Sequence, residues 1–135
     1  MQDRPTVMEY LQAVTHFLDE EAVPNLTGSR QFYGRVAANV LRAVMRELEN
    51  EEHDLFAEWG RLNQLLPPAE RPSAPSALRE AIRQRTDELC QRIRKGDADA
   101  GPYREQVLTH VRECVREKLL VNNPQWIKRP AANRT

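Results

Sequence analysis

Residues 34–48 read GRVAANVLRAVMREL and form the most apolar helical pattern in the chain, although four polar side chains interrupt it. At about 100° per residue, these four fall on one stripe about 60° wide. They are Arg35, Asn39, Arg42 and Arg46. The apolar residues of the same helix, from Phe32 to Leu48, cover an arc of about 240°. A helix with so wide an apolar arc needs contacts on several sides, so we expect it at the centre of a helical bundle.

Helical patterns continue on both sides of this stretch, and strand signals are nearly absent. Thr6 and Glu9 have the spacing of a capping box, which predicts a first helix over 7–22. Its expected core face carries Val7, Tyr10, Leu11, Val14, Phe17 and Leu18. Four more helices are expected over 31–49, 54–66, 76–95 and 102–121, with Gly96 at the C′ position of the fourth.

The later helices also show candidate core faces. Glu51, Glu52, His53 and Asp54 are expected at the start of the third helix, where carboxylates suit the helix dipole. The expected core residues of the third and fourth helices are Leu55, Trp59, Leu62, Leu66, Leu78, Ile82, Leu89 and Ile93. In the fifth helix the apolar face is expected to comprise Tyr103, Val107, Leu108, Val111, Cys114, Val115 and Leu119, with Lys118 projecting into its middle.

The fold class predicted from these patterns is all-α, a single-domain bundle of about five helices over residues 1–126. The segment 67–76 has four prolines in ten positions, which indicates a stiff connector inside the domain. Residues 127–135 are expected to form a mobile C-terminal tail.

Composition excludes several classes of protein. The 135 residues carry 20 basic and 20 acidic side chains, but the charge is uneven: residues 1–67 have a net charge of −5 and residues 68–135 of +5. The halves could attract each other, or the basic half could face an anionic partner. Nucleic acid is not expected as a partner, because the basic residues are not interleaved with aromatic ones. No apolar run approaches a membrane span and no signal-peptide pattern opens the chain, so we expect a cytoplasmic protein.

Motifs for catalysis and metal binding are not found, so we expect no catalytic residues and no metal ligands. A phosphate-binding loop, a zinc-protease motif and a nucleophile elbow are all missing. His16, His53 and His110 fall on three different predicted helices, and Cys90 and Cys114 are expected to be reduced packing residues. The segment starting at Asp97 lacks the glycine and the glutamate that a calcium loop needs.

Two sets of polar residues remain as candidate partner-binding or ligand-binding sites. The arginine stripe of 34–48 either pairs with Asp19, Glu20 or Glu21 of the first helix, or awaits an external carboxylate or phosphate. Lys118 either reaches solvent beside the helix end or places its own positive charge at a partner or ligand site, and Asn122, Asn123 and Trp126 belong to the same candidate corner.

Three segments together carry a resemblance to a known family. They are the opening MQDRPT, the GRVAANVL of the second helix, and KLLVNNP at residues 118–124. The chain resembles a family of small bacterial helical proteins that are typically encoded beside an aminoglycoside-phosphotransferase-like kinase and an acyl-CoA dehydrogenase. Its best understood relative is the small accessory subunit of the 4-hydroxyacyl-CoA kinase of levulinate catabolism.

The resemblance implies a non-catalytic accessory subunit of such a kinase, with ATP and Mg²⁺ bound by the partner and none of its own. It brings no catalytic residues to this chain. Two alternatives stay open: a stand-alone protein that binds acyl-CoA or another anionic ligand, and a homodimeric structural bundle that buries its wide apolar arc in self-association.

Overall fold

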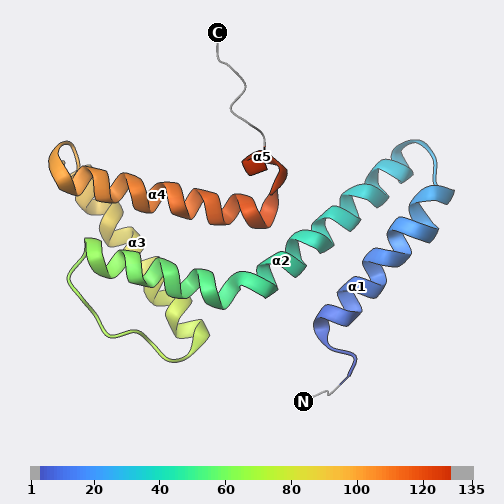
Figure 1. The fold of residues 1–135 in the computed structure, drawn as a ribbon, viewed down its shortest axis with the longest axis horizontal. Coiled ribbons are helices and arrows are strands. Elements are labelled where there is room, and N and C mark those ends of the chain that lie inside the picture. Colours follow the sequence, from blue (N-terminus) through green and yellow to red (C-terminus); the bar gives the residue numbers. More distant parts are fainter. Residues whose placement is uncertain (1–3, 129–135) are drawn as a thin grey trace, which may run out of the picture. The chain divides into compact units, whose positions relative to one another are not determined.

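The protein is all-α in the computed structural model, which describes residues 4–128 (Figure 1). Its α-helices are α1 (Val7–Phe17), α2 (Gly28–Leu65), α3 (Pro75–Arg94), α4 (Gly101–Asn122) and α5 (Gln125–Lys128). A π-helical turn over Leu18–Ala22 and a 3-10 turn over Val23–Asn25 prolong α1. No strand occurs among these described residues, so the predicted all-α fold of about five helices is confirmed. Within the same range, no helix is both long and apolar enough for a membrane span.

The main difference from the predicted helices is that 31–49 and 54–66 are parts of the single helix α2. The expected break at Glu51–Asp54 was wrong: these residues lie inside the helix. Neither glycine nor proline occurs between Gly34 and Gly60, so nothing in this stretch costs the helix more than a fraction of a kcal/mol per residue. The predicted helix 102–121 corresponds to α4, and the count of five is completed by the short helix α5. This helix includes the first two residues of the predicted tail, and residues 129–135 lie outside the described part.

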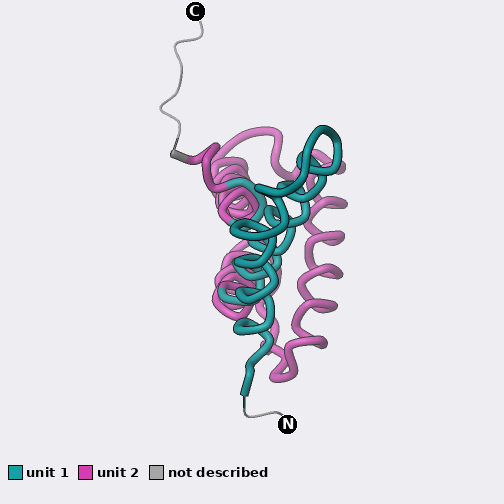
Figure 2. The backbone as a smooth tube through the Cα atoms, turned by 90° about the vertical axis from the view of Figure 1, so that its right-hand side faces the viewer, with its two compact units in different colours: residues 1–49, 121–123 teal, residues 50–120, 124–135 magenta. Residues whose placement is uncertain are grey.

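Contacts divide the chain into two compact units, residues 1–49 with 121–123 and residues 50–120 with 124–135 (Figure 2). In the first unit, α1 and the first part of α2 form an antiparallel hairpin. The predicted capping box starts α1: the Glu9 amide donates to Thr6 Oγ1, and the Thr6 amide donates to the Glu9 carboxylate. The buried residues of the hairpin are small or medium in size, namely Thr15, Val23 and Ala38.

The predicted core faces of this hairpin were largely wrong. Val7, Tyr10, Val14 and Phe17 on α1 are 48–66% exposed, and only Leu11 and Leu18 of the predicted α1 face are half-buried. Most of the large apolar residues on the first part of α2 are exposed as well. Within the first unit, the first part of α2 is therefore not surrounded on several sides. The buried positions of the hairpin are instead Thr15, Val23 and Ala38, and a Cβ on Gly34 would lie only 2.9 Å from Val23 Cγ2.

The second unit holds the main core, built from the C-terminal part of α2 with α3 and α4. Its buried cluster comprises Trp59, Leu62, Leu65, Leu66, Leu78, Ile82, Leu89 and Val107. This confirms the predicted core positions on α2 and α3, except Leu55, which is half-buried against the cluster, and Ile93, which is 37% exposed. The predicted C′ glycine is also confirmed. Gly96 has φ +91°, and the Gly96 and Asp97 amides donate to the carbonyls of Ile93 and Arg92, which is a Schellman motif.

Basic residues of the second half hold the C-terminal end of α2. Arg85 donates to the carbonyls of Leu62 and Pro67, and Arg92 donates to that of Leu65, which also accepts from the hydroxyl of Tyr103. Cations at a helix C-terminus satisfy its free carbonyls and match the negative end of the helix dipole. Part of the positive charge of residues 68–135 thus has a structural role inside the second unit.

Candidate functional site

Two residues of the arginine stripe, Arg42 and Arg46, make contacts inside the first unit. Arg42 forms an ion pair with Asp19 and donates to Asn39 Oδ1 at 2.9 Å. Arg46 Nε donates to the carbonyl of Val121 at 2.7 Å. Asp19 is one of the three acidic residues that the sequence analysis gave as partners inside the chain, so the prediction of an internal ion pair is confirmed for Arg42. Arg35 and Asn39 are exposed, so part of the stripe stays accessible to a partner.

The second set of candidate residues lies at the C-terminal end of α4 and in α5. Lys118 is exposed, which agrees with a lysine that reaches solvent. Asn122 and Asn123 are exposed as well, and Trp126 in α5 is 62% exposed. Each is therefore accessible to a partner.

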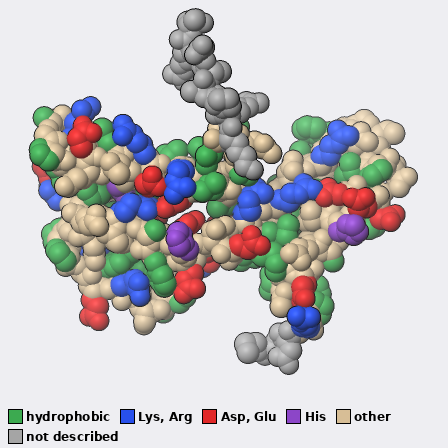
Figure 3. Space-filling model, viewed as in Figure 1, with side chains coloured by type: hydrophobic (Ala, Val, Ile, Leu, Met, Phe, Trp, Pro, Cys, Tyr) green, Lys and Arg blue, Asp and Glu red, His purple; other side chains and the backbone are tan. Residues whose placement is uncertain are grey.

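Exposed apolar stripes run along both helices of the hairpin. On α2 the stripe comprises Tyr33, Val36, Val40, Val44 and Leu48, which are 38–66% exposed. Its members follow one another at three- or four-residue intervals, so they line one side of the helix over about 22 Å. On α1 the stripe comprises Val7, Tyr10, Val14 and Phe17 at the same intervals. Hydrophobic side chains are visible at the surface of this hairpin in Figure 3. We call these residues the hairpin stripes.

The buried face of α4 is more polar than the sequence indicated. His110 and Glu117 are buried beside Val107, whereas Val111 and Val115 are 44% and 51% exposed. The expected apolar face of this helix was therefore wrong by a rotation of about 80°. An arginine of α2 explains the difference. Arg61 donates to both Glu117 oxygens, at 2.8 and 2.6 Å, and this ion pair makes the burial of a carboxylate possible.

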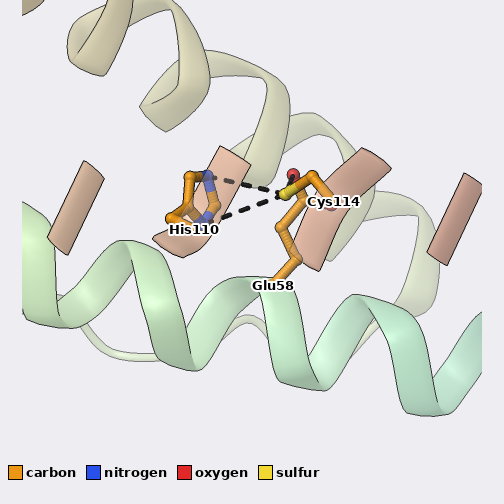
Figure 4. A group of neighbouring side chains, drawn as sticks. All are labelled: Glu58, His110 and Cys114. Carbon is orange, nitrogen blue, oxygen red and sulfur yellow. Dashed lines mark hydrogen bonds between the residues drawn. The ribbon is translucent and has the colours of Figure 1, made fainter. Parts of the chain in front are cut away.

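Next to this ion pair, Glu58, His110 and Cys114 form a compact cluster in the second unit. Glu58 comes from α2, and His110 and Cys114 come from successive turns of α4; all three side chains point toward one another (Figure 4). Cys114 Sγ lies 3.7 Å from Glu58 Oε1, 3.7 Å from His110 Nε2 and 3.8 Å from Nδ1. His110 is buried and the other two residues are half-buried.

Burial sets the protonation of this cluster. It lowers the pKa of His110, and the nearby Arg61 cation lowers it further, so the imidazole is neutral at pH 7. Burial also raises the pKa of the Cys114 thiol, against the opposing effect of the hydrogen bond from Arg61. A protonated thiol is a poor nucleophile, so this arrangement does not suit cysteine catalysis. A neutral imidazole, a thiol and a carboxylate are instead potential metal ligands.

A pocket of about 490 Å³ adjoins the cluster and shares His110 with it. The other residues that line the pocket are Arg61, Gln64, Leu65, Glu105, Gln106 and Thr109.

The sequence analysis did not predict this cluster, because it considered only the spacing between the three histidines and not the spacing between a histidine and a cysteine. His16, His53 and His110 indeed lie on three different helices. The available signal was His110 and Cys114, four residues apart on one helix, a spacing that places two side chains on the same face. Glu58 carries no such signal, since its approach depends on how α2 packs against α4.

A family model described as a domain of unknown function, DUF6285, matches residues 24–126, about three quarters of the chain. The chain belongs to the DUF6285 family. No curated protein and no solved structure is detectably similar to it. The DUF6285 match includes the α2 stripe and the whole Glu58–His110–Cys114 cluster. It begins after α1, so the α1 stripe and Asp19 lie outside the matched segment.

Proposed function

We propose that this protein is a non-catalytic accessory subunit of an aminoglycoside-phosphotransferase-like kinase that phosphorylates 4-hydroxyacyl-CoA in the breakdown of short hydroxy and keto acids such as levulinate. The observation that carries a binding role is the exposure of the hairpin stripes. The kinase as the partner rests on the family resemblance of the opening segment, the second helix and KLLVNNP.

The hairpin stripes have the properties of a docking surface for a helical or grooved partner. Apolar side chains at helical intervals form one continuous side of α2, and such a side binds in an apolar groove or between other helices. Continuous apolar patches on the surface of a soluble chain mark protein interfaces more often than scattered single residues do. The exposed Arg35 and Asn39 add polar contacts at the edge of this surface, as in the polar rim of an interface.

Gene neighbourhood and co-purification test this proposal. We expect genes for a kinase of this type and an acyl-CoA dehydrogenase beside the gene of this chain. When both chains are co-expressed, the tagged kinase should retain this chain. Val40→Glu should abolish that retention, because it places a charge in the centre of the α2 stripe without disturbing a buried position.

Matched variants separate the stripe from the other candidate contacts. Lys118→Glu changes an exposed residue outside the stripes and should leave retention intact, whereas Arg35→Glu changes a residue at the edge of the surface and should weaken retention less than Val40→Glu does. Arg42→Glu is unsuitable, since it would place a carboxylate opposite Asp19 and weaken the hairpin itself. Retention that survives Val40→Glu but not Arg35→Glu would make the arginine stripe the contact. A kinase that never retains the wild-type chain would contradict the proposal.

Self-association is the second candidate, and the same stripes favour it. Two hairpins that paired their stripes would form a four-helix arrangement with the apolar residues inside. Size-exclusion chromatography with light scattering distinguishes the two cases. A stable dimer of the isolated wild-type chain that becomes monomeric on Val40→Glu supports the structural homodimer, whereas a monomer that associates only with the kinase supports the accessory subunit.

A further inference from the structure

We propose that Glu58, His110 and Cys114 bind a zinc-class divalent cation. The site lies entirely within the second unit and uses neither the hairpin stripes nor the arginine stripe. The inference therefore goes beyond the proposed function and does not depend on it.

The spacing of the three ligand atoms carries the proposal. In a tetrahedral zinc site with a Zn–S bond of about 2.3 Å and Zn–N and Zn–O bonds of about 2.0–2.1 Å, the sulfur lies about 3.5 Å from the other ligand atoms. Cys114 Sγ lies 3.7 Å from both Glu58 Oε1 and His110 Nε2. The three ligand atoms all lie within 4.8 Å of one another. The His110 nitrogen and the Glu58 oxygen lie within 4.8 Å of each other, against about 3.4 Å in a tetrahedral site, so side-chain rotations that move these atoms by up to about 1.4 Å would bring all three onto one cation.

The chemistry of the three groups fits the same class of metal. Imidazole nitrogen, thiolate sulfur and carboxylate oxygen are the three side-chain ligands of protein zinc sites. A set with a thiolate disfavours Mg²⁺ and Ca²⁺, which prefer oxygen ligands alone. Three protein ligands leave one tetrahedral position for water or an external ligand, as in zinc sites that are not purely structural.

The surrounding charges allow a cation here. Arg61, the nearest positive group, is held by both oxygens of Glu117, so its charge is compensated locally. On binding, the S–H bond of Cys114 breaks, its proton passes to solvent, and the sulfur lone pair forms the bond to the metal. The ionised Glu58 and Cys114 then balance the two positive charges of the cation. The bound site is neutral overall.

The competing explanation is that the cluster is a hydrogen-bonded group without a metal role. Cys114 S–H can donate to the Glu58 carboxylate, and this contact alone would hold the two helices together. A hydrogen-bonded thiol and a metal-bound thiolate differ in their spectra and in their reactivity, so the two explanations are separable by experiment.

Cobalt binding provides the first test. The full chain is stripped with a chelator, titrated with Co²⁺ and then with Zn²⁺, and followed by absorption. We expect one Co²⁺ per chain with a thiolate-to-cobalt charge-transfer band in the near ultraviolet, displaced by one equivalent of Zn²⁺. Cys114→Ser should abolish the band, and Glu58→Gln should weaken Zn²⁺ binding roughly 100-fold, at the upper end of the effects of perturbing a metal's ligand shell. Cys90→Ser is the control and should bind like the wild type.

Thiol protection provides the second test and does not depend on a disruptive variant. In the Cys90→Ser protein, Cys114 is the remaining thiol. One equivalent of Zn²⁺ should slow its reaction with a thiol reagent at least tenfold, and a chelator should restore the original rate. Absence of the charge-transfer band in the wild-type chain, its loss in Cys90→Ser, or a Cys114 reaction rate unchanged by Zn²⁺ would overturn the proposal and leave the hydrogen-bonded cluster as the explanation.

Discussion

Removal of the Glu117 carboxylate should destabilise the second unit strongly. Arg61 and Glu117 form a two-point ion pair whose side chains are only 19% and 11% exposed. Glu117→Ala would leave the guanidinium beside His110 and Cys114 without its counter-charge, while no described residue accepts a hydrogen bond from its buried Nε. Removing one partner of a buried ion pair costs about 3–5 kcal/mol of unfolding free energy. Because Arg61 keeps some access to water, we expect about 3 kcal/mol, the lower end.

This loss is large enough to measure in a chain of this size. It corresponds to a fall in melting temperature of about 10 °C, taking about 3–4 °C per kcal/mol for a domain between 100 and 150 residues. Urea unfolding is best followed by the fluorescence of the buried Trp59, in a Trp126→Phe background that removes the exposed second tryptophan. The midpoint should fall while the dependence on urea stays the same.

Two controls decide whether the buried charge is the cause. Glu113→Ala removes a carboxylate from an exposed pair with Arg116 on the same helix and should cost less than about 1 kcal/mol. The double variant Arg61→Met with Glu117→Met removes both charges and should recover most of the stability, because apolar pairs can replace buried ion pairs at little cost. A Glu117→Ala loss below about 1 kcal/mol, or a double variant less stable than Glu117→Ala, would refute the reasoning.

Three further predictions use the same unfolding assay or a titration. Leu62→Ala should cost about 2–5 kcal/mol, because Leu62 is fully buried, whereas Val40→Ala should change stability by less than about 0.5 kcal/mol; equal losses would mean that the α2 stripe is core. Gly96→Ala should destabilise by about 1 kcal/mol, because φ +91° is strained for alanine and its Cβ would lie 3.1 Å from Asp99; an unchanged midpoint would contradict this. The hydrogen bond from Arg83 is the main cause that lowers the pKa of Glu80 to about 2. The ionised Glu80 therefore contributes to stability above about pH 4.5, and this contribution is lost as the pH falls toward 2. Carbon NMR titration of Arg83→Ala should return this pKa toward 4.5, and an unchanged value would exclude Arg83 as the cause.

Local signals in the sequence predicted the ends of helices well where one or two residues determine the backbone geometry of the helix end. Thr6 and Glu9 satisfy each other's backbone amides, and Gly96 takes a positive φ that other residues avoid, so both ends follow from short-range chemistry. The helix break expected at Glu51–Asp54 does not occur, because this segment has no local signal strong enough to end a helix. A group of acidic residues favours a helix start only weakly, and no glycine or proline precedes the group to end the helix.

The faces of the helices were predicted less well, because burial depends on partners that lie far away in sequence. Val111 and Val115 follow an apolar periodicity, yet α4 turns His110 and Glu117 inward, since Arg61 and Glu58 on α2 offer them partners. Periodicity ranks positions by hydropathy and contains no information about a matching arginine some fifty residues earlier. The candidate metal ligands were missed for this reason, although the spacing of His110 and Cys114 was visible.

The first unit shows a different reason for failure, and it bears on function. Its buried residues are Thr15, Val23 and Ala38, so the hairpin buries little apolar surface of its own. Full burial of a valine or leucine side chain is worth about 1.5–3 kcal/mol relative to full exposure. The five residues of the α2 stripe are about half exposed, so covering them with a partner would contribute about 4–7 kcal/mol before the costs of association. The apolar periodicity of residues 34–48 predicted a helix buried at the centre of a bundle, and the structure instead leaves most of these side chains exposed. Their role as a contact surface for a second chain is the proposal that the retention and light-scattering experiments test.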